Sequence, residues 1–435
     1  MATHEIQRAF GRRSRAPHTV LIGLLLTALW VAACSIAEPG PVPVPEPADS
    51  ETSYVVMVSF DGMRYDFIDR ADALTFQRVA DVGVRATGLI PGYPTKTFPN
   101  HYGIATGLYP SNHGLVDNTF YDPHFETLYS IGNRDAVQDP RWYWGEPIWV
   151  TAETQGVRTA SYFWVGTEAP IQGVQPSTFK DYDGTVPYAA RVDSVLHWLA
   201  LPDSARPRLV LLYFDEPDAT VHAQGPDHPA VDAVVEELDG HVDRLLDGIE
   251  DSPVAGRVTV ILLSDHGMEA VPEDHVVFLD DHANLDGVRV IYNSTQALLY
   301  FDGDTARVEE VYAELGDLPH TTVYRKADTP WRWHYDHGRR IGELVVAADP
   351  GWVLRSREWT PWRGGGTHGW DPYHRAMHGI FLATGPRIRP GLVIPAFENV
   401  HIYPFVAHLL GLEPAGEIDG RLEVLESVLE PPAAP

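Results

Sequence analysis

The chain has 435 residues, 44% of them hydrophobic and 21% charged, which is enough to bury the core of a body larger than one small module. Its 60 acidic and 32 basic residues give a formal net charge of −28, which argues strongly against a nucleic-acid-binding protein because that affinity depends largely on Lys and Arg. The single cysteine excludes intrachain disulfides and cysteine-rich zinc modules.

Residues 1–33 have the pattern of a signal peptide for export. A stretch with four arginines precedes an apolar segment, which ends in Val31-Ala32-Ala33-Cys34. This ending resembles a bacterial lipobox, so we expect Cys34 to carry a lipid that anchors the protein to the outer membrane or the periplasmic face. A plain secretory signal, which would release a periplasmic protein, is the alternative. Residues 34–52 contain many Pro and acidic residues, and we expect a tether there.

Short apolar runs predict the buried strands of a mainly parallel sheet. They are Tyr54–Phe60, Leu209–Phe214, Val258–Ser264 and Gly379–Thr384. An amphipathic helix is expected between two of them, at Ala230–Glu250, because its apolar residues recur at intervals of three and four. The alternation of strands and helices predicts an α/β/α sandwich over residues 53–428, followed by a disordered tail at 429–435.

Three of the predicted strands are followed directly by acidic residues, two of these sets with a histidine close by. Because ligands of such folds bind beyond the carboxyl ends of the strands, these side chains are expected to meet at one edge of the sheet. Asp218 and His222 are four residues apart, so on a helical turn they share one face. Asp215 is the alternative to Asp218 as a ligand. A further histidine, His368, lies in the glycine-rich loop 364–369. The candidate metal ligands are therefore Asp61, Asp218, His222, Asp265, His266 and His368. Oxygen and imidazole ligands without thiolates suit zinc, with manganese or iron as alternatives.

The segment around Thr97 is the other unusual stretch. A threonine hydroxyl becomes a nucleophile only when a metal or a base lowers its pKa. Composition alone favours a plainer interpretation, in which Thr97 caps a helix before Phe98-Pro99.

Taken in order, these pieces resemble the nucleotide pyrophosphatase/phosphodiesterase family of the alkaline phosphatase superfamily, and the chain looks like a bacterial member. The matching motifs, which extend from about residue 55 to 385, are Ser59-Phe60-Asp61-Gly62, Thr97-Phe98-Pro99-Asn100-His101, Asp117-Asn118, Glu216-Pro217-Asp218 with His222, Ser264-Asp265-His266-Gly267 and Thr367-His368-Gly369. The resemblance implies an alkaline phosphatase-like sandwich with capping insertions, and it makes residues 53–428 a catalytic phosphodiesterase domain.

The resemblance also implies a two-zinc site and a role for each candidate. One Zn²⁺ would be held by Asp218, His222 and His368, and the other by Asp61, Asp265, His266 and the oxygen of Thr97. Thr97 would attack phosphorus and form a phosphothreonine intermediate that water then hydrolyses, while Asn118 would donate a hydrogen bond to a phosphoryl oxygen. The expected substrates are nucleoside 5′-phosphodiesters or pyrophosphates, cleaved to nucleoside monophosphates, with Phe98 and Tyr213 clamping the base.

Other activities of the same superfamily are alternatives. A phosphomonoesterase with a threonine nucleophile would carry a Lys-x-Arg pair, but the region that we compare, residues 161–166, is uncharged and rich in aromatic residues. A phosphonoacetate hydrolase-like enzyme and a choline-phosphate diesterase remain open, and a surface lipoprotein that binds metal or solute is an alternative of another class. We expect no stable nucleic-acid complex and no obligate protein partner. The insertions at 119–200 and 285–365 are expected to shape substrate access.

Overall fold

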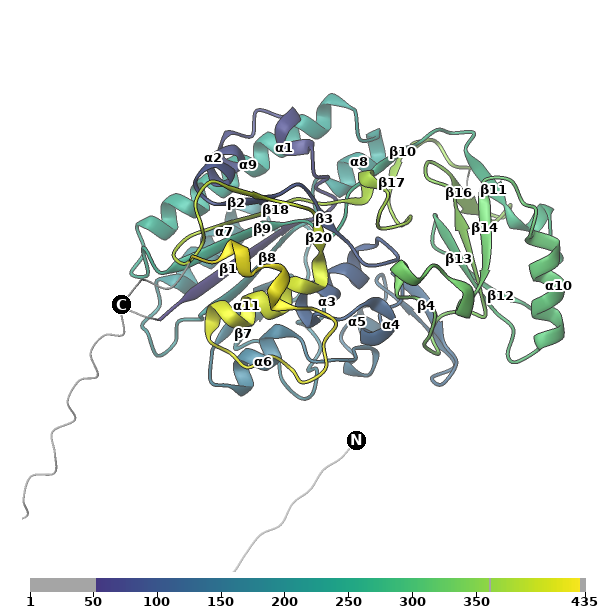
Figure 1. The fold of residues 1–435 in the computed structure, drawn as a ribbon, viewed down its shortest axis with the longest axis horizontal. Coiled ribbons are helices and arrows are strands. Elements are labelled where there is room, and N and C mark those ends of the chain that lie inside the picture. The colour runs from purple at the N-terminus through teal and green to yellow at the C-terminus, as the bar shows by residue number, and fades with distance from the viewer. Residues whose placement is uncertain (1–51, 360, 431–435) are drawn as a thin grey trace, which may run out of the picture. The chain divides into compact units, whose positions relative to one another are not determined.

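The structure is a computed structural model that describes residues 52–359 and 361–430 (Figure 1). The predicted signal peptide, Cys34, nearly all of the predicted tether and residues 431–435 lie outside the described residues. At the other end of the body, Leu429 forms a β-bridge with Ile388, and the Glu430 N–H donates to the Arg387 carbonyl (2.8 Å). The folded body therefore extends two residues past the predicted boundary at 428. Over the described ranges, no helix combines the length and the apolarity that a bilayer crossing requires.

An eight-stranded sheet forms the centre, in the order β19-β2-β18-β9-β1-β8-β6-β7. Its strands, in that order, are Leu392–Ile394, Val84–Ala86, Phe381–Thr384, Val258–Leu263, Tyr54–Phe60, Leu209–Phe214, Thr159–Tyr162 and Thr178–Lys180. Neighbouring strands are parallel except where β18 pairs with β2 and β9. The mostly parallel sheet is thus confirmed, and β1 and β8 coincide with two of the predicted strands. β9 ends one residue before the predicted end, and β18 begins at Phe381 rather than at residue 379.

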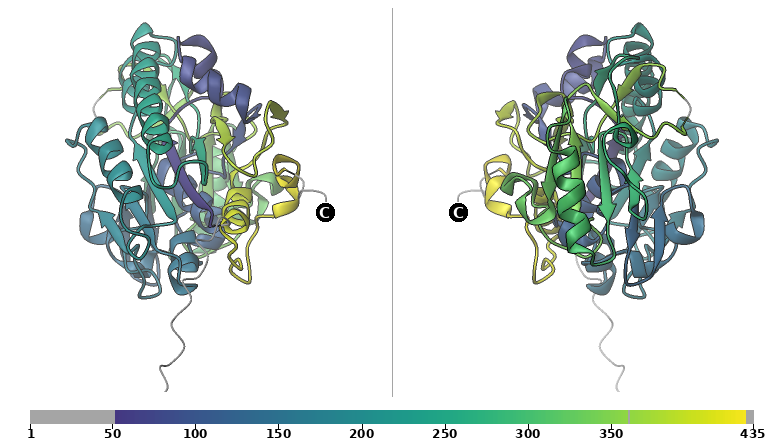
Figure 2. Two further views of the ribbon diagram at one scale, coloured as in Figure 1. Left: turned by 90° about the vertical axis from the view of Figure 1, so that its left-hand side faces the viewer. Right: turned by 90° about the vertical axis from the view of Figure 1, so that its right-hand side faces the viewer.

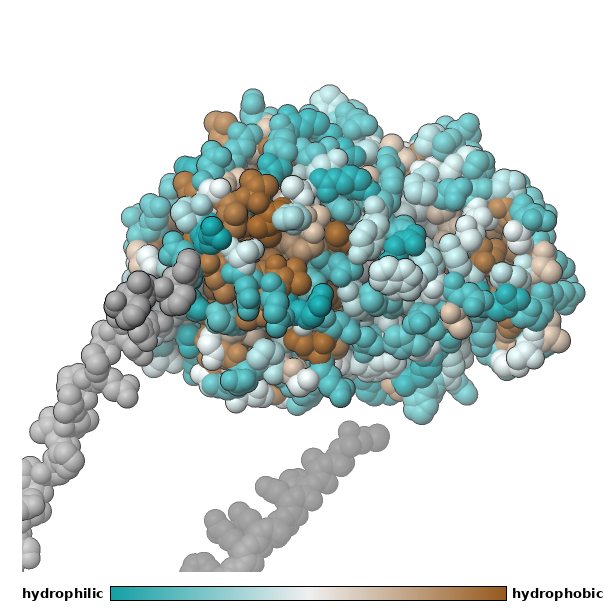
Figure 3. All heavy atoms as spheres, viewed as in Figure 1, coloured by the Kyte–Doolittle hydropathy of each residue, from teal (hydrophilic) through white to brown (hydrophobic). Residues whose placement is uncertain are grey.

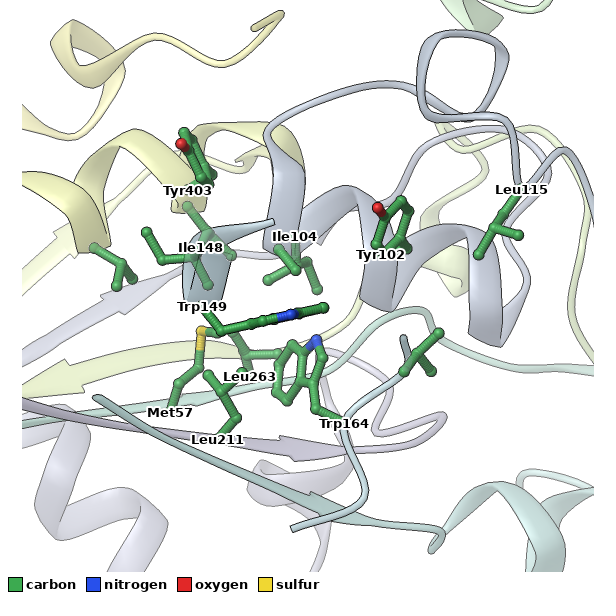
Figure 4. Close-up of a cluster of buried hydrophobic side chains, with 14 of the residues drawn as sticks. Met57, Tyr102, Ile104, Leu115, Ile148, Trp149, Trp164, Leu211, Leu263 and Tyr403 are labelled. Atoms are coloured by element: carbon green, nitrogen blue, oxygen red, sulfur yellow. The ribbon is translucent and has the colours of Figure 1, made fainter. Parts of the chain in front are cut away.

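Helices cover both faces of this sheet (Figure 2). One face packs against α1 (Phe67–Arg70), α2 (Leu74–Val82), α7 (Tyr188–Leu199) and α9 (Pro229–Glu250), the last at the predicted place. The other face packs against α3 (Thr97–Thr106), α6 (Ile148–Thr154) and α11 (Ile402–Leu410). Successive strand residues point to opposite faces, so Val56 and Val58 of β1 join one core and Val55 and Met57 the other. Figure 4 shows part of the core that contains Val55 and Met57, in which Met57, Leu211 and Leu263 lie beneath Trp149 and beside Trp164.

Smaller elements surround the sheet. The largest is a four-stranded sheet in the order β12-β13-β15-β14 with helix α10, at the right of Figure 1. Its elements are Arg289–Tyr292, Gln296–Tyr300, Leu344–Ala348, Thr321–Arg325 and, for α10, Thr305–Leu315. The two-stranded sheets are β3–β20 (Leu89–Ile90, Phe397–Glu398), β4–β5 (Thr119–Asp122, Thr127–Ser130), β10–β17 (Glu269–Val271, Gly365–Thr367) and β11–β16 (Val276–Phe278, Val353–Arg355). The short helices are α4 (Pro110–His113), α5 (Arg134–Val137) and α8 (Asp218–Gln224).

The visible surface is mixed in polarity. In Figure 3, apolar residues gather over the region where Figure 1 places β2, β18 and α11, and the part around the four-stranded sheet is mostly hydrophilic. Large apolar side chains that are strongly exposed include Leu74, Val82, Trp331 and Val393.

Candidate active site

The ends of β1, β8 and β9 bring the predicted acidic residues to one edge of the sheet. In the parallel registers, Phe60 of β1 lies beside Phe214 of β8, and Ser59 lies beside Leu263 of β9. Hydrogen bonds join the segments that follow: the Asp218 N–H donates to the Asp61 carbonyl (3.0 Å), and the Gly62 N–H donates to Asp265 Oδ1 (3.2 Å). The three acidic segments therefore share one site.

The first predicted ligand group is brought together at the start of α8. Asp218 and His222 lie one turn apart on this helix, and His222 Nε2 is 3.4 Å from Asp218 Oδ1. His368 enters from the segment after β17, with its Nε2 atom 3.6 Å from the same oxygen. Asp215 belongs to none of the sets of metal-capable side chains among the described residues and pairs with the buried Arg191 (2.9 Å).

Glycines allow β17 to pack closely on α8. A Cβ atom at Gly365 would lie 2.4 Å from the His222 carbonyl oxygen, and one at Gly366 would lie 2.6 Å from Val221 Cγ1. Gly365 also has a φ of +127°, which L side chains rarely adopt. The glycine-rich loop predicted to approach a site closely does so at the backbone that carries His222.

The second predicted group lies beside the first. His266 Nε2 is 3.4 Å from Asp61 Oδ1, 3.0 Å from Asp265 Oδ2 and 3.3 Å from Thr97 Oγ1. The rings of His266 and His368 stack with centroids 3.7 Å apart, so the two groups are adjacent. Within the described ranges, three overlapping sets of metal-capable side chains occur, and all three contain residues of this site: Asp218, His222 and His368; Asp61, Asp218 and His266; and Asp61, His101 and Asp265.

Hydrogen bonds distinguish the histidines that can bind a metal from His101. The Nδ1 atoms of His222, His266 and His368 each lie next to a backbone carbonyl, of Gly366 (2.9 Å), Gly267 (3.0 Å) and Thr95 (2.7 Å). A carbonyl only accepts, so Nδ1 carries the proton and Nε2 is left as the ligand atom. His101 has Nδ1 engaged with the Thr97 carbonyl (2.9 Å) and Nε2 engaged with Ser59 Oγ (2.8 Å), which is not a candidate ligand, whereas His266 Nε2 contacts the candidate ligand Thr97 Oγ1. His101 thus holds the segment at Thr97 in place.

Each of the three carboxylates of the site has one oxygen atom without a partner in the described protein. Asp61 Oδ1, Asp218 Oδ1 and Asp265 Oδ2 are buried without a hydrogen-bond partner within the described part of the chain. Burial, and then the neighbouring Asp265 and Asp218, raise the pKa of Asp61 well above its ordinary value. Burial also raises the pKa of Asp218 and lowers the pKa of His368. Orphaned carboxylate oxygens close to imidazole Nε2 atoms fit divalent cations, which would give these oxygens a partner and offset their negative charge.

Thr97 lies at the first position of α3, with Lys96 before it. Its hydroxyl oxygen faces His266, and the Phe98 N–H donates to Asn118 Oδ1 (3.0 Å). Asn118 is thereby held beside the candidate nucleophile, where the prediction requires an amide donor. Lys96, which the sequence analysis did not single out, is buried and donates to the His368 carbonyl (2.6 Å). Burial lowers the pKa of Lys96 to about 8.

A cavity of about 320 Å³ opens beside Thr97 and is lined by both Phe98 and Tyr213. Tyr213, however, is only 8% exposed, and its hydroxyl donates to Asp61 Oδ2 (2.6 Å). Tyr182, which lies in a loop between β7 and α7, lines the same cavity and is 42% exposed. The sequence analysis missed Tyr182 because no motif or periodicity marks this loop. The base-clamping role of Phe98 and Tyr213 stays a prediction, with Tyr182 as the more accessible partner for Phe98.

Comparisons with known proteins agree with this geometry. The model of the family described as type I phosphodiesterase/nucleotide pyrophosphatase matches residues 55–371. The chain is 35% identical over 380 residues to mouse ectonucleotide pyrophosphatase/phosphodiesterase family member 1, covering 85% of this chain and 42% of that protein. It is 34% identical over 390 residues to an uncharacterized pyrophosphatase/phosphodiesterase of Schizosaccharomyces pombe, covering 85% and 79%. The chain thus spans about two fifths of the length of the mouse relative.

Solved structures of relatives share the fold. Murine ectonucleotide pyrophosphatase/phosphodiesterase 5 superimposes with a TM-score of 0.82 at 30% identity, covering 87% of this chain and 100% of that one. An inactive form of the same murine protein, in complex with AMP, has the same score and coverage. The predicted α/β sandwich with a mostly parallel central sheet is confirmed, and the structure adds small inserted sheets around it.

Proposed function

Because this chain belongs to the type I phosphodiesterase/nucleotide pyrophosphatase family of the alkaline phosphatase superfamily, we propose that it is a metal-dependent hydrolase that cleaves nucleoside 5′-phosphodiesters or pyrophosphates to nucleoside monophosphates. One observation carries the proposal: three orphaned carboxylate oxygens and three imidazole Nε2 atoms converge beside the hydroxyl of Thr97. This donor set suits two zinc ions, one held by Asp218, His222 and His368 and the other by Asp61, Asp265, His266 and Thr97.

When bound, such ions lower the pKa of a coordinated oxygen and stabilise negative charge on a phosphoryl group. The residues of the chain position the reactants. Thr97 supplies the attacking oxygen: its bond to phosphorus forms as the phosphorus bond to the leaving alcohol or phosphate breaks, and the nucleoside phosphate stays on Thr97. The proton that the Thr97 hydroxyl loses balances the proton that the leaving oxygen takes up. The contact between the Thr97 carbonyl and His101 maintains the position of this residue. Asn118 donates a hydrogen bond to a phosphoryl oxygen, which stabilises the charge that develops in the transition state. Water then hydrolyses the phosphothreonine.

The cavity beside Thr97 supports a nucleotide as substrate. The exposed ring of Tyr182 and the half-buried ring of Phe98 line a space of about 320 Å³, at the lower end of the size range of small-molecule sites. Stacking between aromatic rings accepts any base, because every base has a π-face.

The charges that line the cavity support a diester rather than a monoester. All its lining residues are within the described ranges, and Arg134 is the one cation among them. The guanidinium of Arg134 is paired with Glu168. A dianionic monoester therefore gains no free positive side chain here, whereas a diester brings one negative charge fewer.

The membrane attachment rests on the sequence alone. We propose that the protein is exported by residues 1–33, lipidated at Cys34 and held off the membrane by the Pro-rich segment, because the lipobox-like ending and the spacer follow each other directly.

Hydrolysis of p-nitrophenyl thymidine 5′-monophosphate by the purified protein tests the activity. We expect turnover that a chelator abolishes and Zn²⁺ restores, slower cleavage of the monoester p-nitrophenyl phosphate, and about two bound metal ions per chain by elemental analysis. His368→Ala should lose one of the two ions and most of the activity. Asp227→Asn changes a carboxylate that is 81% exposed, and it serves as the control, which should keep both metal ions and the activity. Protein that binds two ions but turns over no diester would contradict the proposal and favour a metal-binding lipoprotein.

A further inference from the structure

The direction of the Asn118 side-chain amide is defined by one hydrogen bond. The Phe98 N–H donates to Asn118 Oδ1 (3.0 Å), so Nδ2, the donor atom of the amide, faces away from Phe98. Asn118 is half-buried, and within residues 52–359 and 361–430 no group accepts a hydrogen bond from its Nδ2 atom. This donor is therefore free for a phosphoryl oxygen, and its position depends on the contacts that hold Asn118.

A buried carboxylate holds Asn118 from the residue before it. Asp117 is 0% exposed; its Oδ1 accepts from the Asn118 N–H (2.7 Å), and its Oδ2 accepts from Gln296 Nε2. Both partners donate, so Asp117 acts as a carboxylate. Burial raises its pKa to about 7, although the charge of Lys96 and these two hydrogen bonds oppose the rise. Gln296 therefore stabilises the carboxylate that fixes the Asn118 backbone.

Gln296 comes from the inserted four-stranded sheet, where it is the first residue of β13. It is 0% exposed, and its Oε1 atom has no hydrogen-bond partner among the described residues. Because a buried amide with an unpaired oxygen costs stability, packing alone does not account for a glutamine at this position. The hydrogen bond to Asp117 does account for it.

The same sheet also holds the residue after Asn118. Asn293, in the turn between β12 and β13, donates from Nδ2 to the carbonyl of Thr119 (2.9 Å), the first residue of β4. Asn118 itself has a backbone contact, from the Ile131 N–H to its carbonyl (3.1 Å). Gln296 and Asn293 therefore act on the two neighbours of Asn118 in the chain.

We propose that Gln296 and Asn293 are positioning residues, which hold the Asn118 amide in place for a phosphoryl oxygen. They act through Asp117 and Thr119, and neither of them lines the cavity beside the nucleophile. The inference rests on the proposed function, in which Asn118 stabilises the transition state. The inserted sheet thus influences the rate of the reaction without touching the substrate.

Steady-state kinetics of the metal-loaded variants with p-nitrophenyl thymidine 5′-monophosphate test the proposal. Asn118→Ala removes the donor and should lower kcat about 100- to 1000-fold. Gln296→Leu only displaces the donor, so it should lower kcat about 3- to 30-fold and change KM by less than about 2-fold, because the weakened interaction forms in the transition state. Asn293→Ala, at a half-buried residue of a turn, should act in the same direction and more weakly.

A double variant separates positioning from general destabilisation. If Gln296 acts through Asn118, Gln296→Leu should have no further effect on kcat in protein that already carries Asn118→Ala. Tyr300→Phe is the matched control, because Tyr300 lies on the same strand, is 3% exposed and donates its hydroxyl to the Arg340 carbonyl (2.7 Å). This variant also removes a buried hydrogen bond of β13, but it should leave kcat unchanged.

Crystal structures of the wild type and the variants give a readout that does not depend on turnover. The contact between the Phe98 N–H and Asn118 Oδ1 should be kept in Tyr300→Phe and lengthened or lost in Gln296→Leu. If Gln296→Leu does not fold, Asn293→Ala provides the same measurement.

The possible outcomes distinguish this proposal from the proposed function. An Asn118 amide that moves in Gln296→Leu, in a protein whose wild type cleaves no diester, would contradict the proposed function and support the positioning role. The proposal is overturned if Asn118 stays in place in the Gln296 and Asn293 variants, if Gln296→Leu and Tyr300→Phe lower kcat equally, or if the effects of Gln296→Leu and Asn118→Ala multiply.

Discussion

Two tyrosines that line one cavity should respond differently to mutation. Tyr182 is exposed and has the position of a stacking platform, so Tyr182→Ala should remove about 1–3 kcal/mol of base stacking. At about 1.4 kcal/mol per tenfold, kcat/KM for p-nitrophenyl thymidine 5′-monophosphate should fall about 5- to 150-fold. A diester without a base, methyl p-nitrophenyl phosphate, should be cleaved as by the wild type. Tyr182→Phe keeps the ring and should change neither.

Tyr213 should affect both substrates, because its hydroxyl donates to Asp61 (2.6 Å), a predicted metal ligand. Burial, and then the Asp61 charge, raise the pKa of Tyr213, so the hydroxyl remains a donor. A hydrogen bond to a charged group is worth about 1.5–3 kcal/mol, so Tyr213→Phe should lower kcat/KM about 10- to 150-fold for both diesters. Steady-state kinetics of the variants on the two substrates decide the matter. The reasoning is refuted if Tyr182→Ala impairs both substrates equally, or if Tyr213→Phe impairs only the nucleotide.

Three further changes test other parts of the molecule. Thr97→Ala should retain both metal ions and lose at least about three orders of magnitude in rate, and near-normal turnover of folded, metal-loaded protein would show that Thr97 is not the nucleophile. Asp122→Asn should destabilise the fold by about 3–5 kcal/mol near pH 7, because the fully buried Arg340 loses its carboxylate partner. Burial alone would raise the pKa of Asp122, but hydrogen bonds from Arg339 and Arg340 lower it to about 2. The Asp122 carboxylate therefore stabilises the fold above its ordinary pKa near 4, and this stabilisation is lost as the pH falls towards 2. If denaturation shows that Asp122→Asn costs the same free energy of unfolding at pH 7 and at pH 2, the reasoning is contradicted. Cys34→Ser should leave an unprocessed precursor that no longer receives a lipid, and normal cleavage and release of this variant in cell fractionation would favour a plain secretory signal.

The central strands were predictable because burial on both faces leaves continuous apolar runs in the sequence. β1 and β8 match their runs to the residue, and α9 begins one residue before its predicted start. The direction of β18 was not predictable, since a short apolar run indicates a buried strand of a mainly parallel sheet but does not reveal a single strand that runs the opposite way.

The part of the site that comes directly after strands could be predicted from the sequence. The apolar runs place Asp61, Asp218 and Asp265 at one edge, and the family motifs add Thr97 and Asn118. Tyr182 and Lys96 were missed for a physical reason. Their roles depend on where an irregular loop and a buried ammonium group lie after folding, and neither leaves a periodic pattern in the sequence.

The glycines of β17 have a consequence for how this protein can vary. With a hydrogen atom in place of a side chain, Gly365 brings the backbone of β17 against the backbone of His222. Most distances between ligands in proteins can be adjusted in small steps by exchanging one core side chain for another of different volume. Here the contact at Gly365 is with the backbone of His222, so no exchange of a core side chain adjusts the spacing at that point of the first ligand group.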